Sequence, residues 1–479
     1  MRSAARAAAI RPRPRTTADA EVAAAATGAT VTGLQEAFSC RWRGAVTNRC
    51  APGRYPVRMT SAVNHGFSQD HAALLDSLAA TPDLLLIQDL DGVCMGLVHD
   101  PLTRTLERDY LEAAARLGDA FAVLTNGEHI GARGVNAIVD RVFGAPGHAA
   151  AHGAYLPGLA AGGVQLQDRF GTLSHPGVSD AELAFLQGVP TRMTRWLSTL
   201  LLGAPYHLEP HRVATLAATC VLDNPASPTL NLNALHHALA EQPALYAQLQ
   251  RQAADFMQAL LREARAEGLD GAFFVHYAPN LGRDDAGAER LKPAAEGDAG
   301  TTDFQFMLEG AVKEAGVLVL LNHHVHARTG RWPLGADFNA RQAPRTLEAQ
   351  VALARAQIAP ADMPRLVGVG DTVTSVAHDG AQLRGGSDRG FLTLVQRLGE
   401  AFGTDNRVLF VDSSAGAVRR AGLDAARLSA GAGDAGFDPR TAALGITDAD
   451  DPLRLDVVFP GGHAQYVEFF CALAQRRAA

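Results

Sequence analysis

Two aspartates separated by one residue follow a short apolar segment, and this spacing suits chemistry that needs paired carboxylates. Residues 84–87 are apolar and lie between Pro82 and Gly92, which predicts a buried strand of a parallel sheet. Asp89 and Asp91 come directly after it, at the edge where such sheets bind ligands. On extended backbone both carboxylates point to the same side. Because a cation or a proton must offset their charges, the segment predicts a functional site.

Two later segments end in the same way. Residues 121–124 form a second apolar strand that ends at Thr125, and residues 366–369 form a third that ends at Gly370 and Asp371. Three strands that each end in a polar residue are far more specific than any one of them. Helix capping is the ordinary alternative for Thr125, but the three segments together favour a catalytic site.

Composition narrows the class of protein. The 479 residues are 47% hydrophobic and 19% charged, which is typical of a globular enzyme of two or three domains. The net charge of -7 argues against non-specific binding of nucleic acid. No apolar run reaches the roughly 18–20 residues that a membrane span needs. The five cysteines are irregularly spaced and fit neither a disulfide framework nor a zinc site, which predicts a cytoplasmic protein.

The elements around the three strands predict the fold class. Helical patterns over 106–117 and 130–143 alternate with the strands, which indicates an α/β fold with a doubly wound parallel sheet. Downstream, the pattern predicts a helix near 302–315, a strand over 317–321 and a last strand over 408–411.

Residues 175–285 break this alternation, because they contain long helical patterns and one apparent strand at 272–277. An insertion of this size predicts an α/β cap domain between a first core segment, 59–174, and a second, 286–479. Residues 1–58 are rich in arginine and alanine without apolar periodicity, which predicts a disordered arm. An arginine-rich, acid-poor start can imitate an organelle transit peptide. An upstream start codon, with Met59 as the functional start, is the favoured explanation of that arm.

Longer stretches resemble the glucosylglycerol-phosphate phosphatases, a family of the haloacid-dehalogenase type. The resemblance extends over about residues 68–475, and the segments that support it are 89–98, 100–104, 124–129, 302–308, 368–375, 384–390, 458–463 and 465–470. It implies a haloacid-dehalogenase-like core and hydrolysis of 2-O-glucosylglycerol 3-phosphate to glucosylglycerol and phosphate. It also suggests a place in compatible-solute synthesis during salt stress, with a glucosylglycerol-phosphate synthase as protein partner.

The resemblance further implies roles for the residues at the strand ends. Asp89 would be the nucleophile that forms an aspartyl-phosphate, and Asp91 the general acid and base. Thr125 would donate its hydroxyl to a phosphoryl oxygen. Mg²⁺ would be held by Asp89, the backbone carbonyl of Asp91, and Asp371.

The family also requires a cation, and this chain has only two lysines, Lys292 and Lys313. Lys292 lies in a polar loop before the predicted 302–315 helix, from which a side chain can reach the site. Lys313 lies late in that helix, where a cation offsets the helix dipole. The sequence therefore favours Lys292. Thr374 and Ser375 occupy the positions where many relatives have a second carboxylate, which indicates a weaker metal site.

Four further residues are candidates for substrate contacts. Glu128 and His129 follow Thr125 and are placed to touch glycerol or glucose hydroxyls. Arg384 and Arg389 are set among glycines before an apolar helix, an arrangement that suits an anion or sugar clamp.

Two alternatives stay open. One keeps the enzyme class and changes the substrate to trehalose phosphate or sucrose phosphate. The other is a non-catalytic sugar-phosphate-binding partner of a glycosyltransferase, against which the presence of all four strand-end residues argues.

Overall fold

The structure, a computed structural model, describes residues 66–478 except 146, 286 and 432–435. The predicted arm at 1–58 and the alternative start at Met59 lie outside these residues. None of the helices within the described ranges is long and apolar enough to cross a membrane.

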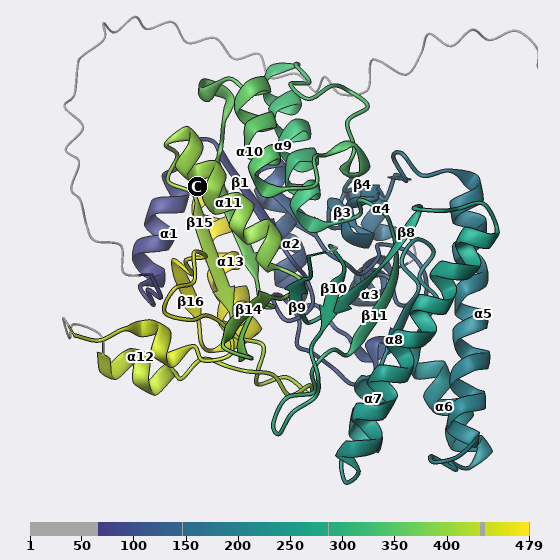
Figure 1. Cartoon of the computed structure of the whole chain (residues 1–479). Helices are drawn as coiled ribbons and strands as arrows, with labels where there is room; N and C mark the ends of the chain where they lie inside the picture. The colour runs from purple at the N-terminus through teal and green to yellow at the C-terminus, as the bar shows by residue number, and fades with distance from the viewer. Residues whose placement is uncertain (1–65, 146, 286, 432–435, 479) are drawn as a thin grey trace, which may run out of the picture. The chain divides into compact units, whose positions relative to one another are not determined.

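Eight strands form the central sheet in the order β16-β15-β12-β1-β2-β3-β4-β5 (Figure 1). The pairings from β16 to β3 are parallel, and β4 and β5 are added antiparallel at one edge. The predicted α/β class with a mostly parallel sheet is therefore confirmed. The strands are β1 (Leu84–Gln88), β2 (Phe121–Leu124), β3 (Gly158–Ala160), β4 (Gln165–Gln167), β5 (Leu173–Ser174), β12 (Arg365–Gly370), β15 (Arg407–Val411) and β16 (Val457–Phe459).

Helices cover both faces of this sheet. Alternate residues of β1 point to opposite faces, and all of them are apolar up to Ile87, so each face needs a covering layer. Leu85 and Ile87 pack in one apolar cluster, with helices α9 (Lys313–Thr329), α10 (Leu347–Gln357), α11 (Arg389–Phe402) and α12 (Ala425–Gly431). Leu84 and Leu86 pack in a second cluster, with helices α1 (His71–Ala79), α2 (Arg108–Leu117), α3 (Val135–Phe143), α4 (His148–His152) and α13 (Gly462–Ala478).

A separate antiparallel sheet has the strand order β6-β7-β11-β8 and its own apolar cluster. Its strands are β6 (Val221–Leu222), β7 (Thr229–Asn231), β8 (Phe273–Ala278) and β11 (Asp303–Leu308). The helices that contribute to this cluster are α5 (Asp180–Leu202), α6 (Pro210–Cys220), α7 (Asn233–Ala238) and α8 (Pro243–Ala266). Figure 1 shows β8 and β11 of this sheet beside helix α8. Two hairpins complete the fold, β9 (Asn280–Arg283) with β10 (Glu289–Leu291) and β13 (Thr374–His378) with β14 (Ala381–Gly385).

Two predicted elements are wrong, and they are neighbours. Residues 303–308 form strand β11 instead of a helix, and residues 317–321 lie inside helix α9 instead of forming a strand. The run from Val317 to Leu321 is buried on all sides, so its apolar character has no helical period that sequence reading can detect.

The pairing of β11 changes where the cap domain would end. This strand lies beyond residue 285, where the sequence places the end of the cap, yet it pairs with β7 and β8 of the four-stranded sheet. We propose a cap domain that begins with α5 at Asp180 and ends with β11 at Leu308.

Candidate active site

The ends of three neighbouring parallel strands position the predicted catalytic residues. Asp89 follows β1, Thr125 follows β2 and Asp371 follows β12. Because β1 pairs with both β2 and β12, the three residues meet at one edge of the sheet. Asp89 and Thr125 line a pocket there together with Asp91.

Lys313 also lines this pocket and lies against the Asp89 carboxylate. Its Nζ is 2.6 Å from an Asp89 oxygen and 2.6 Å from Asp388. Burial raises the pKa of Asp89 to about 8, although the ammonium of Lys313 opposes this shift. Burial alone would lower the pKa of Lys313, but the charges of Asp388 and Asp89 outweigh it and raise that pKa. The lysine therefore stays protonated between the two acids.

The structure brings Lys313 to Asp89, not Lys292, which the sequence favoured. Lys292 Nζ instead pairs with Asp298 at 2.6 Å. The helix boundary behind that choice was wrong, because the sequence placed Lys313 late in a helix, whereas Lys313 is the first residue of α9. The N-terminal end of a helix repels a cation, so a buried lysine there needs acidic partners.

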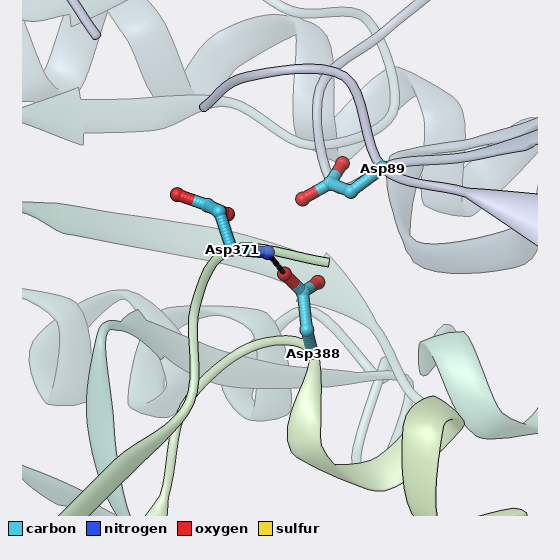
Figure 2. Close-up of side chains that lie close together, drawn as sticks. All are labelled: Asp89, Asp371 and Asp388. Carbon is cyan, nitrogen blue, oxygen red and sulfur yellow. Dashed lines mark hydrogen bonds between the residues drawn. The ribbon is translucent and has the colours of Figure 1, made fainter. Parts of the chain in front are cut away.

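Asp388 is an acid of this site that the sequence did not lead us to expect. One of its oxygens meets Lys313, and the other accepts hydrogen bonds from the backbone N–H groups of Asp371 and Thr372, both at 2.9 Å. Burial opposes its ionisation, but Lys313 lowers its pKa overall. Figure 2 shows Asp388 beside Asp371 and Asp89.

A hairpin explains why this acid was not found. Strands β13 and β14 are inserted between Asp371 and Asp388, so the second carboxylate comes 17 residues after the first instead of three or four. Thr374 and Ser375 are directed elsewhere, since Thr374 donates to the Asn280 carbonyl and Ser375 to Asp448. The position of Asp388, directly before helix α11, was the one local feature in the sequence that could have indicated this acid.

The three carboxylates form a group that can hold a metal ion. Ligand oxygens of Asp89, Asp371 and Asp388 lie within 4.8 Å of one another (Figure 2). Burial and the charge of Asp388 raise the pKa of Asp371 to about 6, although Arg420 opposes this shift. One oxygen of Asp371 is buried without a hydrogen-bond partner, and the Arg420 guanidinium is 3.6 Å from it.

Gly92 permits the close approach of Asp371. It has a φ of +81°, and a Cβ on it would lie 2.1 Å from the unpartnered Asp371 oxygen. Any side chain at this position would therefore displace the carboxylate. The Asp371 oxygen that lacks a hydrogen-bond partner and this glycine fit a small hard cation that prefers oxygen ligands.

Asp91 and Thr125 line the same pocket, and each forms hydrogen bonds with nearby groups of the core. Both oxygens of Asp91 accept from Nη1 of Arg104, at 2.8 and 3.1 Å. Thr125 Oγ accepts from the Gly127 N–H at 3.1 Å, which leaves its own proton for another acceptor. Arg104, like Arg420, is a pocket cation that the sequence analysis did not single out.

A sequence profile of the glucosylglycerol-phosphate phosphatases matches residues 83–474. The chain belongs to this family. The glucosylglycerol-phosphate phosphatase of Synechocystis sp. is 50% identical over 420 residues, which cover 86% of this chain and 97% of that protein. As a member of the family, the chain is a phosphomonoester hydrolase.

Solved structures that match most of the chain in length are much more distant in sequence. The C-terminal domain of trehalose-6-phosphate phosphatase from C. albicans is 11% identical, with a TM-score of 0.42 over 86% of this chain and 98% of that one. Trehalose-6-phosphate phosphatase from Aspergillus fumigatus is 10% identical, with a TM-score of 0.34 over 86% and 99%.

Of the predicted substrate residues in this phosphatase, Glu128 lines the pocket and His129 does not. The Glu128 carboxylate accepts from the backbone N–H groups of Ala226 and Ser227, both at 2.7 Å, so it joins the sheet edge to the segment before β7. Burial raises its pKa. His129 is fully buried, which lowers its pKa to about 4, and its ring faces the Gly158 carbonyl at 3.3 Å.

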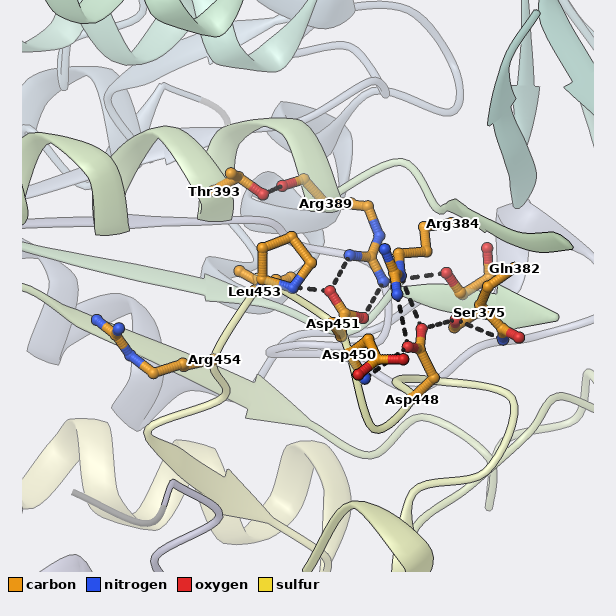
Figure 3. A network of polar contacts seen from close by, with 12 residues as sticks. Ser375, Gln382, Arg384, Arg389, Thr393, Asp448, Asp450, Asp451, Leu453 and Arg454 are labelled. Atoms are coloured by element: carbon orange, nitrogen blue, oxygen red, sulfur yellow. Dashed lines mark hydrogen bonds and ion pairs between the residues drawn. The ribbon is translucent and has the colours of Figure 1, made fainter. Parts of the chain in front are cut away.

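The predicted clamp residues of this family member lie in a separate network (Figure 3). Arg384 pairs with Asp448 at 2.6 Å and Arg389 with Asp451 at 2.8 Å. Neither arginine lines the pocket. They hold the β13–β14 hairpin and the start of α11, and so the segment that contains Asp388. Their partners are about 60 residues downstream, which no local pattern reveals.

Proposed function

We propose that this enzyme hydrolyses 2-O-glucosylglycerol 3-phosphate to glucosylglycerol and phosphate, with Asp89 as the nucleophile. The position of the Asp89 carboxylate supports this most directly. It lies at a strand end, lines the pocket, and is 2.6 Å from the Nζ atom of Lys313. Membership of the glucosylglycerol-phosphate phosphatase family supports the substrate.

The residues suggest a reaction in two steps. An Asp89 oxygen attacks phosphorus and forms an aspartyl-phosphate, while the bond from phosphorus to the glycerol oxygen breaks. Asp91 gives a proton to that leaving oxygen. Asp91 then takes a proton from water, which attacks phosphorus, releases phosphate and restores Asp89. The Thr125 hydroxyl donates to a phosphoryl oxygen throughout.

Lys313 has the electrostatic role in this proposal, and Asp388 positions it. A phosphomonoester dianion is repelled by carboxylates, and the ammonium beside Asp89 reduces that repulsion. Both oxygens of Asp388 are occupied, one by Lys313 and one by backbone N–H groups, so this acid serves to hold its neighbours.

We assign the metal site to Mg²⁺, held by the carboxylates of Asp89 and Asp371 and the backbone carbonyl of Asp91. When bound, this ion supplies positive charge next to the phosphate oxygens. The unpartnered Asp371 oxygen supports the assignment.

Replacing Lys313 tests the choice between the two lysines. Lys313→Met should lower kcat by about 10²–10³-fold, the usual effect of removing one preorganised donor from an active site. Lys292→Met is the matched control, because it removes an ion pair with Asp298 outside the pocket. Steady-state phosphate release measures both variants.

Lys313→Met also leaves two buried carboxylates without their cation, so thermal unfolding must accompany the kinetics. Lys313→Arg keeps the positive charge between the two acids, so it serves as a second variant if Lys313→Met does not fold. A larger loss of kcat in Lys292→Met than in Lys313→Met contradicts the assignment.

Phosphate release from a panel of sugar phosphates tests the substrate. Glucosylglycerol 3-phosphate should exceed glycerol 3-phosphate and glucose 6-phosphate in kcat/KM by roughly 100-fold or more, because polar pocket groups are left unpaired by a truncated substrate. Trehalose 6-phosphate and sucrose phosphate are the informative competitors. Equal efficiency with either one would replace the proposed substrate.

This activity would place the enzyme in the synthesis of a compatible solute for salt tolerance. We continue to predict that the enzyme lies in the cytoplasm and that its protein partner is a glucosylglycerol-phosphate synthase.

A further inference from the structure

The cap sheet provides a polar wall of the catalytic pocket. Asn231 at the end of β7, Asn233 at the start of α7, and Asp303 and Gln305 on β11 all line the pocket that contains Asp89. Strand alternation explains the arrangement, since Phe304 and Phe306 of β11 pack in the apolar cluster of the cap.

Two oxygen atoms of this wall are buried without a hydrogen-bond partner. They are Oε1 of Gln305 and Oδ1 of Asn233. Gln305 is 7% exposed and Asn233 is 8% exposed. Buried polar atoms are normally paired, and one that is not destabilises the protein. Among the described residues that line the pocket, these are the two side-chain amide oxygens that are both buried and without a hydrogen-bond partner.

The pocket combines charged groups with the amides of the cap wall. Lys313 and Arg420 lie beside the carboxylates of Asp89 and Asp371. The cap wall has amides and one acid, Asp303, whose carboxylate accepts a hydrogen bond from Asn231 at 2.7 Å. A carboxylate and neutral amides do not attract a phosphate, but they are suitable partners for hydroxyl groups, which both donate and accept.

We infer that Gln305 and Asn233 bind hydroxyl groups of the glucosyl unit and determine the preference for a sugar phosphate. This rests on the proposed function and names the residues that would recognise its substrate. Since both amide oxygens are unpaired in the free protein, a hydroxyl that donates to them restores a missing hydrogen bond at the moment of binding.

Gln305→Met tests this inference in the full chain with Mg²⁺. Methionine keeps the length of the side chain and removes the amide. We expect the ratio of kcat/KM for glucosylglycerol 3-phosphate to kcat/KM for p-nitrophenyl phosphate to fall about 10- to 100-fold, as for the loss of a buried hydrogen bond that leaves a polar group unpaired. The melting temperature should stay the same or rise, because the variant removes an unpaired buried oxygen.

Gln350→Met is the matched control. Gln350 on α10 is also buried, and its Oε1 also lacks a partner, but the residue does not line the pocket. This variant should keep the wild-type ratio. Gln305→Glu is a second test at the same site, because it retains an acceptor of the same length and should lose less of the ratio than Gln305→Met.

The outcomes separate this inference from the proposed function. Wild-type enzyme that hydrolyses neither substrate contradicts the proposed function itself. Wild-type enzyme that prefers glucosylglycerol 3-phosphate, with an unchanged ratio in folded Gln305→Met, overturns the inference alone. A lower melting temperature in Gln305→Met with an unchanged ratio would assign Gln305 a structural role instead.

Discussion

Asp89→Asn is expected to reduce phosphate release to background while the fold stays intact. The amide has the shape of the carboxylate but cannot attack phosphorus, so no aspartyl-phosphate forms. The site should tolerate the substitution, since burial already disfavours the charged form of Asp89 and the charges of Asp388 and Asp371 add to that effect. Steady-state phosphate release measures the loss.

Two measurements make this result specific. Thermal unfolding should show a melting temperature close to that of the wild type, which separates lost chemistry from lost structure. Wild-type enzyme quenched during turnover with radiolabelled substrate should retain label on the protein, and Asp89→Asn should not. Turnover in this variant close to the wild-type rate would disprove the assignment of Asp89 as the nucleophile.

Removal of divalent metal is expected to abolish activity, and Mg²⁺ should restore it. The reason is the group of buried acids at the strand ends, where an oxygen of Asp371 has no hydrogen-bond partner and burial raises the pKa of Asp89 and Asp371. Ca²⁺ should restore activity poorly, because it favours more ligands at longer distances than Mg²⁺ does. Phosphate release after exhaustive chelation and stepwise addition of each ion is the measurement.

Gly92→Ala gives a companion test of the same site. A Cβ at this position would lie 2.1 Å from the Asp371 oxygen, so this variant should need much more Mg²⁺ for half-maximal activity. Full activity of the wild type after chelation would exclude the metal-dependent mechanism, whatever the behaviour of the glycine variant.

The parts of this site that could be predicted from the sequence are those that a strand places directly. A run of buried residues followed by a polar one is a local pattern, and β1, β2 and β12 each end in this way before Asp89, Thr125 and Asp371. Parallel pairing then brings these ends to one edge. The α/β class followed from the same alternation of strands and helices.

The segment around β11 and α9 shows where local patterns are insufficient. The run from Val317 to Leu321 in α9 is buried throughout and shows no helical period, so the helix was read as a strand. The segment of β11 was read as a helix, although Phe304 and Phe306 alternate with polar residues. That exchange also hid the position of Lys313 at the start of α9, and with it the difference from Lys292.

The sequence by itself therefore determined the family, the fold class and the acids and threonine at the strand ends, because each depends on neighbours in the chain. Only the tertiary structure decided which lysine meets Asp89, that Asp388 supplies the distant second carboxylate, and that Arg384 and Arg389 are held by other acids. These ion pairs join residues from about 60 to more than 200 positions apart. A buried charge takes whichever opposite charge the folded chain brings to it, and no local spacing encodes that partner.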